Sequence, residues 1–329
     1  MQPARHEQPS RPVYQGAPDK GGLSPVSVPS NDTTQPQVHA DLQPGAAVHP
    51  YVGLALATVA VSFAAILIKE STAQPITTAA YRLALTTVLL LPLVGGARRQ
   101  CIRALSGRNL TLIVAAGCLL ALHFAFWTAS LSYTTVASSV LFVSIHPALV
   151  AALGWPLLGE RLSRRALAGI LLTLLGSVIV AGGDLRLSAT AFRGDGLAVL
   201  GAIALAGYLL IGRAARPRLD NISYSTLVYA VCTLALIGIS FLARQALLPV
   251  SGHDLLIFLG LAVICTLGGH LLYNWTLRYV PAVVVSVSFL GEPVIASLLA
   301  WPILGQSLMA GTIAGGLVIL AGIWLTAQA

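Results

Sequence analysis

Charged residues are scarce in this sequence, and their scarcity excludes most classes of soluble protein. Only 9% of the 329 residues are charged, against roughly a quarter in ordinary soluble domains, whereas 56% are hydrophobic and the mean hydropathy is +0.83. Residues 1–50 alone hold seven of the charged residues and nine of the eighteen prolines. The remainder consists of long apolar runs, so the composition predicts a protein that crosses a membrane many times.

Features of other protein classes are missing as well. Four scattered cysteines suggest neither a disulfide framework nor a metal cluster, and we expect no metal and no cofactor. The net charge of +8 forms no basic stripe interleaved with aromatic residues, so nucleic acid is not an expected partner. Residues 1–50 lack the apolar core of a signal peptide, and their Pro- and Gln-rich composition predicts a disordered cytoplasmic tail.

Ten apolar runs have the length of about 20 residues that a helix needs to cross a bilayer. We expect them near 51–68, 76–96, 109–130, 134–158, 165–182, 196–213, 222–243, 254–277, 282–304 and 309–327. If the amino terminus is cytoplasmic, eleven arginines lie in the inner loops and only four basic residues in the outer ones. Because basic loops stay inside, both termini are expected in the cytoplasm.

The second half of the chain repeats the first at an offset of 146 residues. Between Pro147 and Ala181, 13 of 35 positions are identical to the stretch that begins at Pro293. Each half holds five expected spans, an odd number, so the second half should be upside down relative to the first. The sequence thus predicts an all-α membrane protein of ten helices in two inverted five-helix repeats, 51–183 and 194–329. This is the architecture of secondary transporters, whose site lies where the halves meet.

Two related segments carry a family resemblance. The pattern P-x(7)-WPLLGERLS and the pair GEPV and AWPILGQ, in a chain of ten spans, resemble the drug/metabolite transporter superfamily in its EamA-type exporter branch. The resemblance covers roughly residues 51–327. It implies export of small metabolites, such as amino acids or amphiphilic drug-like compounds, driven by the proton gradient or by exchange, across a bacterial inner membrane. Gln306 departs from the family, which usually carries a second glutamate there.

The resemblance also bears on the glycines of the fifth and tenth spans. These spans mediate packing or self-association in the family, and glycines recur in them at a spacing of seven, as Gly169, Gly176, Gly315 and Gly322. Such spacing permits close helix contact. A homodimer is therefore one of the partners that the pattern would allow.

Glu292 is the only one of eleven acidic residues that lies in the middle of an expected span. A charge there costs about 2.5–3.5 kcal/mol, so its presence needs a reason. His146 holds the equivalent position in the first repeat, and Pro147 and Pro293 follow the two residues. The prolines should break both helices and frame a translocation site, with simple packing kinks as the alternative. Glu292 could couple transport to protons, or remain protonated and only bond a neighbouring helix.

Further polar and aromatic residues inside the spans complete the candidate site. His123 and Trp127 lie one turn apart in the third span, and His270, Tyr273 and Asn274 occupy a similar face of the eighth at an offset of 147. The two sets could form a polar and aromatic wall for a substrate. The alternative is that they are core residues hydrogen-bonded between helices, with aromatic residues near the interface.

Arg82 is the only basic residue well inside an expected span. It lies ~9 Å from the outer end, where it could bind an anionic substrate group, serve a gate or snorkel to the interface. No catalytic residues are expected, because G-x-S-x-G, H-E-x-x-H and P-loop motifs are all missing. A membrane-embedded enzyme, a channel and a scaffold are alternatives, but the inverted repeat favours a transporter whose partners are a small-molecule substrate and membrane lipid.

Overall fold

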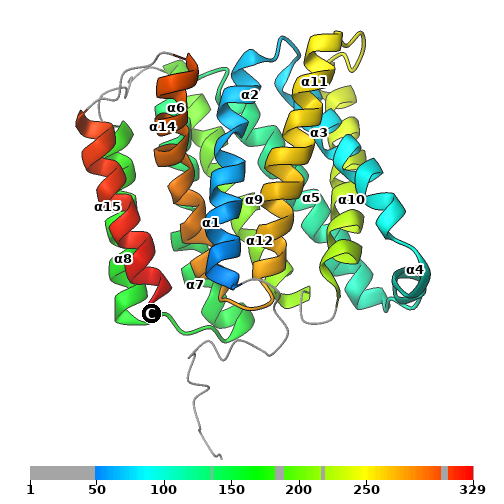
Figure 1. Ribbon diagram of the computed structural model, residues 1–329, viewed down its shortest axis with the longest axis horizontal. Coiled ribbons are helices and arrows are strands. Elements are labelled where there is room, and N and C mark those ends of the chain that lie inside the picture. Colours follow the sequence, from blue (N-terminus) through cyan, green and yellow to red (C-terminus); the bar gives the residue numbers. More distant parts are fainter. Residues whose placement is uncertain (1–48, 135, 182–188, 216–218, 305–309, 329) are drawn as a thin grey trace, which may run out of the picture. The chain divides into compact units, whose positions relative to one another are not determined.

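The computed structural model describes residues 49–134, 136–181, 189–215, 219–304 and 310–328, which form helices and short connections (Figure 1). Residues 1–48 of the expected tail and Gln306 lie outside the described residues. In the first half the helices are α1 (Pro50–Ser62), α2 (Ala64–Glu70), α3 (Pro75–Leu90), the 3-10 turn η1 (Leu91–Leu93), α4 (Gly96–Arg103), α5 (Gly107–Ser130), α6 (Val136–Val143), α7 (His146–Leu158) and α8 (Arg164–Ala181).

The second half holds a similar series of helices. They are α9 (Ala189–Ala215), α10 (Asn221–Leu242), α11 (Gly252–Gly260), the π-helix η2 (Leu261–His270), α12 (Leu271–Thr276), α13 (Ala282–Ser288), the 3-10 turn η3 (Phe289–Gly291), α14 (Glu292–Leu304) and α15 (Ala310–Ala327). Local chemistry fixes several starts. Proline opens α1 and α3, and the side chains of Ser106, Asp220 and Ser251 accept backbone N–H groups at the starts of α5, α10 and α11.

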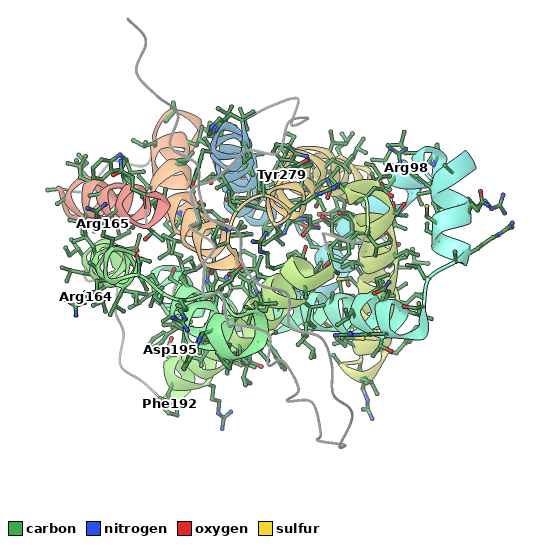
Figure 2. The ribbon with its side chains drawn as sticks, turned by 90° about the horizontal axis from the view of Figure 1, so that it is seen from below. Arg98, Arg164, Arg165, Phe192, Asp195 and Tyr279 are labelled. Carbon is green, nitrogen blue, oxygen red and sulfur yellow. The ribbon has the colours of Figure 1, made fainter. Side chains whose placement is uncertain are left out.

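The helices make the chain a multi-pass membrane protein. Within the described ranges, eight are long and apolar enough to cross a membrane, and Ala282–Ala296 is a shorter apolar helix. The fifth expected span, which corresponds to α8, is not among these eight, and the ninth contains the shorter helix. The count of ten spans therefore stays a prediction. Helix α4 was not expected; it is short, exposed and arginine-bearing, and the end-on view shows Arg98 at the edge of the bundle (Figure 2).

Helices α8 and α15 make the most extensive contact between two helices (Figure 1). Their glycines bring the backbones together: a Cβ added at Gly169 would lie 2.7 Å from the carbonyl oxygen of Gly322, and one at Gly176 would lie 2.7 Å from that of Gly315. The later glycine of one helix meets the earlier one of the other, so the two helices are antiparallel. The glycine pattern is therefore used inside one chain, which removes it as an argument for a homodimer.

The remaining helix contacts also follow the repeat. Helix α5 packs on α9 and α10, and the corresponding segment, η2 with α12, packs on α1 and α3. Helices α6 and α7 contact α9, just as α13 and α14 contact α1. Exchanging the two halves thus converts each of these contacts into another one. The contact of α3 with α10 and that of α8 with α15 are each converted into themselves, because the two helices of each pair hold equivalent positions. The fold has the two-repeat architecture that the offset of 146 indicates.

The fourth and ninth expected spans are each broken at the residue that precedes a proline. Helix α6 ends at Val143 and α7 begins at His146, while α13 ends at Ser288 and α14 begins at Glu292. Proline at the second position of a helix has no N–H to satisfy and cannot extend the preceding turn. The breaks therefore occur at equivalent positions, on segments that contact each other through α7 and α13.

The π-helix η2 accommodates a difference in length between two equivalent spans. Helix α5 has 24 residues, whereas Gly252–Thr276 has 25. A wider turn takes up one extra residue without disturbing the helix on either side. Consequently Phe124, and not His123, is the equivalent of His270, since the offset downstream of the π-helix is 146. His123 lies one residue before the position equivalent to His270, as the offset of 147 between the two histidines requires.

Candidate functional site

A chain of aromatic contacts joins the two repeats in the interior. The ring centroids of Phe124 and His270, the equivalent pair, are 5.7 Å apart, and those of His270 and Phe289 are 5.8 Å apart. Phe289 stacks on Tyr273 at 3.9 Å and meets the edge of His146 at 5.9 Å. Residues from α5, the end of η2, α12, η3 and α7 thus form one cluster, which we call the central cluster.

Arg82 reaches this cluster from α3 and is only 3% exposed. Its Nε donates a hydrogen bond of 2.7 Å to Oγ1 of Thr266, which itself donates to the carbonyl of Leu261 within the π-helix. The guanidinium carbon lies 5.1 Å from the centroid of the Phe124 ring. Arg82 does not snorkel to the interface: its charge is held inside the protein by a hydroxyl and an aromatic face.

Glu292 contributes the acidic group of the same region. Its side chain is partly exposed, although it begins α14 inside the bundle, and its charge interacts with that of Arg82. The two groups form no ion pair within 4 Å, since the ion pairs among the described residues are Arg98–Asp220 and Arg213–Glu160. An acid and a base thus share the interior of the protein without direct contact.

His146 ties the two repeats together through its ring nitrogens. Nδ1 lies 2.9 Å from the carbonyl oxygen of Val143, which the Pro147 break leaves without its usual partner, and Nε2 lies 3.1 Å from that of Ser286 on α13. A neutral imidazole has one N–H and can donate to only one of these oxygens, whereas a protonated imidazole can donate to both. A neutral His146 can therefore donate either to Val143 or to Ser286, and only a protonated one can donate to both at the same time.

His123 and Trp127 lie against α9 beside the cluster. Nδ1 of His123 donates to the carbonyl of Gly201 at 3.0 Å, and its ring is parallel to that of Trp127 at 6.2 Å. Trp127 keeps its indole N–H buried without a partner among the described residues. His270 differs, because neither of its ring nitrogens has a hydrogen bond in the described part of the chain. Of the two histidines, His123 is thus held by a hydrogen bond and His270 by contacts with aromatic rings.

Asn274 and Tyr273 point to different neighbours. Asn274 accepts a hydrogen bond from Tyr208 at 2.6 Å and donates to Ser225 and Tyr229, each at 3.1 Å. This buried network links α12 to α9 and α10, as a core network would. The Tyr273 hydroxyl lies 2.8 Å from that of Thr58, on α1, so Tyr273 joins the central cluster to the first helix.

The two ends of the bundle are each closed by an acidic residue that bridges the repeats. At one end, which we call the Asp254 end, Asp254 accepts hydrogen bonds from Ser71, Thr72 and Ser251. At the other, the Glu160 end, Arg213 forms an ion pair of 2.7 Å with Glu160 and donates to the carbonyl of Leu277. Glu160 also accepts the backbone N–H of Ala282. Each closure joins a loop of one repeat to the other repeat.

Several of these residues could not be recognised in the sequence. Thr58, Thr266, Phe124 and Phe289 are common residues of apolar spans. Only the fold brings Thr266 and Phe124 to Arg82, and Thr58 and Phe289 to Tyr273. The Glu160–Arg213 pair had a sequence signal, since Glu160 lies in a loop and Arg213 in the last turn of α9, which the expected topology places at one end. No group of three histidine, cysteine, aspartate or glutamate residues that could hold a metal occurs in the described ranges.

Comparison with known proteins identifies relatives over almost the whole membrane region. The family described as the EamA-like transporter family matches residues 50–182 and 192–328. An "uncharacterized transporter" of Archaeoglobus fulgidus is 26% identical over 282 residues, which are 84% of this chain and 96% of that protein. A solved crystal structure aligns with a TM-score of 0.70 at 17% identity, over 85% of this chain and 96% of the other, and so shares the fold.

Proposed function

Because this chain belongs to the EamA-like transporter family, we propose that it is a secondary active transporter that moves small molecules by alternating access. The observation that supports this most directly is the exchange of helix contacts between two repeats, with α8 and α15 antiparallel. Two inverted repeats of five spans can rock against each other and expose a site between them to either side in turn. Export of amino acids or amphiphilic compounds is the activity that the resemblance favours.

The central cluster, with Arg82 and Glu292, is the proposed substrate site. It combines apolar rings from both repeats with few polar groups, which suits a small molecule that has an apolar body and a charged or polar group. His146 and Glu292, at equivalent breaks in the helices, are the groups that would exchange protons. Glu292 would bind a proton in one state and release it in the other, so that transport is driven by the proton gradient.

We propose that the Asp254 end faces outward and that the Glu160 end and both termini are cytoplasmic, in agreement with the loop arginines. Each end closes through hydrogen bonds between the repeats, so one closure would open while the other holds. A cysteine at Gln306 should then react with an impermeant thiol reagent from outside, in a chain whose exposed Cys101 is replaced by alanine. A cysteine at Ser163 should not. Reaction at both, or the reverse, would contradict this orientation.

The function is tested by untargeted metabolite analysis of the growth medium. Cells that overproduce the protein should release one or a few compounds beyond the level of cells that carry the empty vector. Cells that produce Glu292→Gln at the same membrane abundance should release much less. An unchanged medium, or an inability of the purified protein in vesicles to move the released compounds, would contradict the transporter proposal.

A further inference from the structure

The guanidinium of Arg82 keeps unused hydrogen-bond donors in the interior of the protein. Arginine has five N–H donors, and the one on Nε bonds Thr266. Nη2 is buried and has no partner, and no further hydrogen bond from Arg82 occurs in the described part of the chain. A buried charged donor without an acceptor is among the most unfavourable arrangements in a protein, so a native role for these donors is expected.

None of the described residues neutralises the charge of Arg82 by direct contact. Phe124 offers a ring face. His123 and His270 cannot act as counter-ions, because a protonated imidazole would repel the guanidinium. Glu292 is the acid that attracts it, but lies beyond ion-pair distance. The planar fork of an arginine matches a carboxylate, which accepts two parallel hydrogen bonds from it.

We propose that Arg82 is the anion-binding residue of the transport site and that the transported molecules carry a carboxylate. Their apolar part would pack on Phe124, whose ring faces the guanidinium, and on Phe289 and Tyr273 of the central cluster. This inference rests on the proposed transport function and narrows it, because it excludes cationic amphiphiles and uncharged compounds as the main substrates. A cation would meet a buried positive charge, and an uncharged group would leave that charge without a counter-ion.

Two kinds of carboxylate satisfy this chemistry, and Glu292 distinguishes them. A monoanion would compete with the charge of Glu292 for Arg82, so it would bind best when Glu292 is protonated. An amino acid zwitterion would instead give its carboxylate to Arg82 and its ammonium to Glu292. The contact with Arg82 is the same in both cases.

The test is ligand-induced thermal stabilisation of the purified full-length protein in detergent. The probes are phenylacetate and L-phenylalanine, with the isosteric amide phenylacetamide and the cation phenethylammonium as controls. At least one carboxylate should raise the melting temperature of the wild type, and the amide and the cation should not. Arg82→Gln should weaken carboxylate binding at least about tenfold, and Arg82→Lys should weaken it less.

The matched control is Arg108→Gln, at the exposed start of α5, which should bind the carboxylates as the wild type does. With Glu292→Gln, binding of phenylacetate should be kept or strengthened if the site takes monoanions. Binding of phenylalanine should be weakened if the site takes amino acid zwitterions.

Three results would overturn the inference: stabilisation by the amide or the cation as large as that by a carboxylate, no response to either carboxylate, or unchanged binding by folded Arg82→Gln. If that variant does not fold, the contrast between phenylacetate and phenylacetamide on the wild type still decides. Transport of the same probes into vesicles that contain the purified protein distinguishes a failure of this inference from a failure of the proposed transport function. Transport of neutral or cationic probes alone would refute carboxylate selection and keep the transporter, whereas carboxylate binding with no transport would refute the function only.

Discussion

The contact between α8 and α15 and the central cluster are both built from equivalent positions of the two repeats, yet they differ in composition. In the helix pair, glycine meets glycine in both directions, and the charged residues Arg164 and Arg165 lie at the start of α8, before the paired glycines. In the cluster, Phe124 meets His270, His146 corresponds to Glu292, and the Arg82 position is valine in the second repeat, at Val228. The two repeats thus have the same residues at equivalent positions where helices only pack, and different residues where the charged groups of the site lie.

This difference has a physical reason. Close packing of two backbones needs the smallest residue on both helices, so a change on either side is unfavourable. A substrate without twofold symmetry needs different groups on its two sides, which a symmetric site cannot offer. The predictions below test whether the two regions divide these roles.

The largest effect is expected at the symmetric contact. Gly176→Leu should abolish folding or cost about 3 kcal/mol or more, because its side chain would run into the backbone of α15. Gly238→Leu on α10 is the matched control, since a Cβ there meets nothing within 4 Å. Thermal unfolding in detergent and membrane abundance measure both. Equal stability of the two variants would show that the α8–α15 contact is not the rigid part of the fold.

The next effect is expected at the asymmetric pair. Glu292→Gln should abolish proton-driven uptake into vesicles and spare exchange, since glutamine keeps a hydrogen bond but does not titrate, whereas His146→Gln should keep part of the activity. Wild-type pH dependence in the Glu292→Gln vesicles would end the coupling role. If Glu292 is only structural, Gln should be nearly silent and Glu292→Leu should lower the melting temperature.

The closures of the two ends should respond in opposite directions. Asp254→Ala removes the acceptor of several hydrogen bonds to Ser71 and Thr72, which should favour opening of that end, whereas Glu160→Ala should favour opening of the other. Each variant should lose about 1–3 kcal/mol of stability. Thiol labelling of a cysteine at Ala57, buried on α1, should rise in one variant and fall in the other. A parallel change in both would mean that the closures only stabilise the fold.

The smallest effect concerns Asp220, the residue that caps α10 outside the span. Partial burial opposes ionisation of its carboxyl, but hydrogen bonds from Ser223 and the nearby Arg98 outweigh it and lower the pKa. Because the folded pKa is below the ordinary value, the ionised cap stabilises at neutral pH and this contribution disappears as pH falls through that pKa. Asp220→Ala should therefore cost about 1 kcal/mol at pH 7 and less below about pH 4. A cost independent of pH would assign the loss to packing.

The repeat was easier to predict from the sequence than the site. Proline, glycine and tryptophan at matching positions revealed the offset of 146, and apolar runs revealed the helical spans. The π-helix had no such signal, because one extra apolar residue in an apolar run changes neither composition nor length appreciably. For that reason His123 and His270 were noted at an offset of 147, and the contact between Phe124 and His270 emerged only from the structure.

The charged residues of the site were found for a different reason. Arg82, Glu292 and His146 are rare residue types inside spans, so each one needs an explanation wherever it lies. Which of them lie together depends on packing between distant segments. Asn274 illustrates the limit: its position suggested the substrate wall, but the structure surrounds it with Tyr208, Ser225 and Tyr229.

The single extra residue held by η2 has a consequence for how duplicated membrane proteins diverge. A one-codon insertion in an ordinary helix would rotate everything beyond it by about 100° and turn inward residues toward lipid. The wide turn absorbs that rotation, so that Asp254 still reaches Thr72 on one side of η2 and Tyr273 still reaches Thr58 on the other. Duplicated repeats can therefore differ in length inside a span, and an alignment that forbids such gaps would misplace half of that helix.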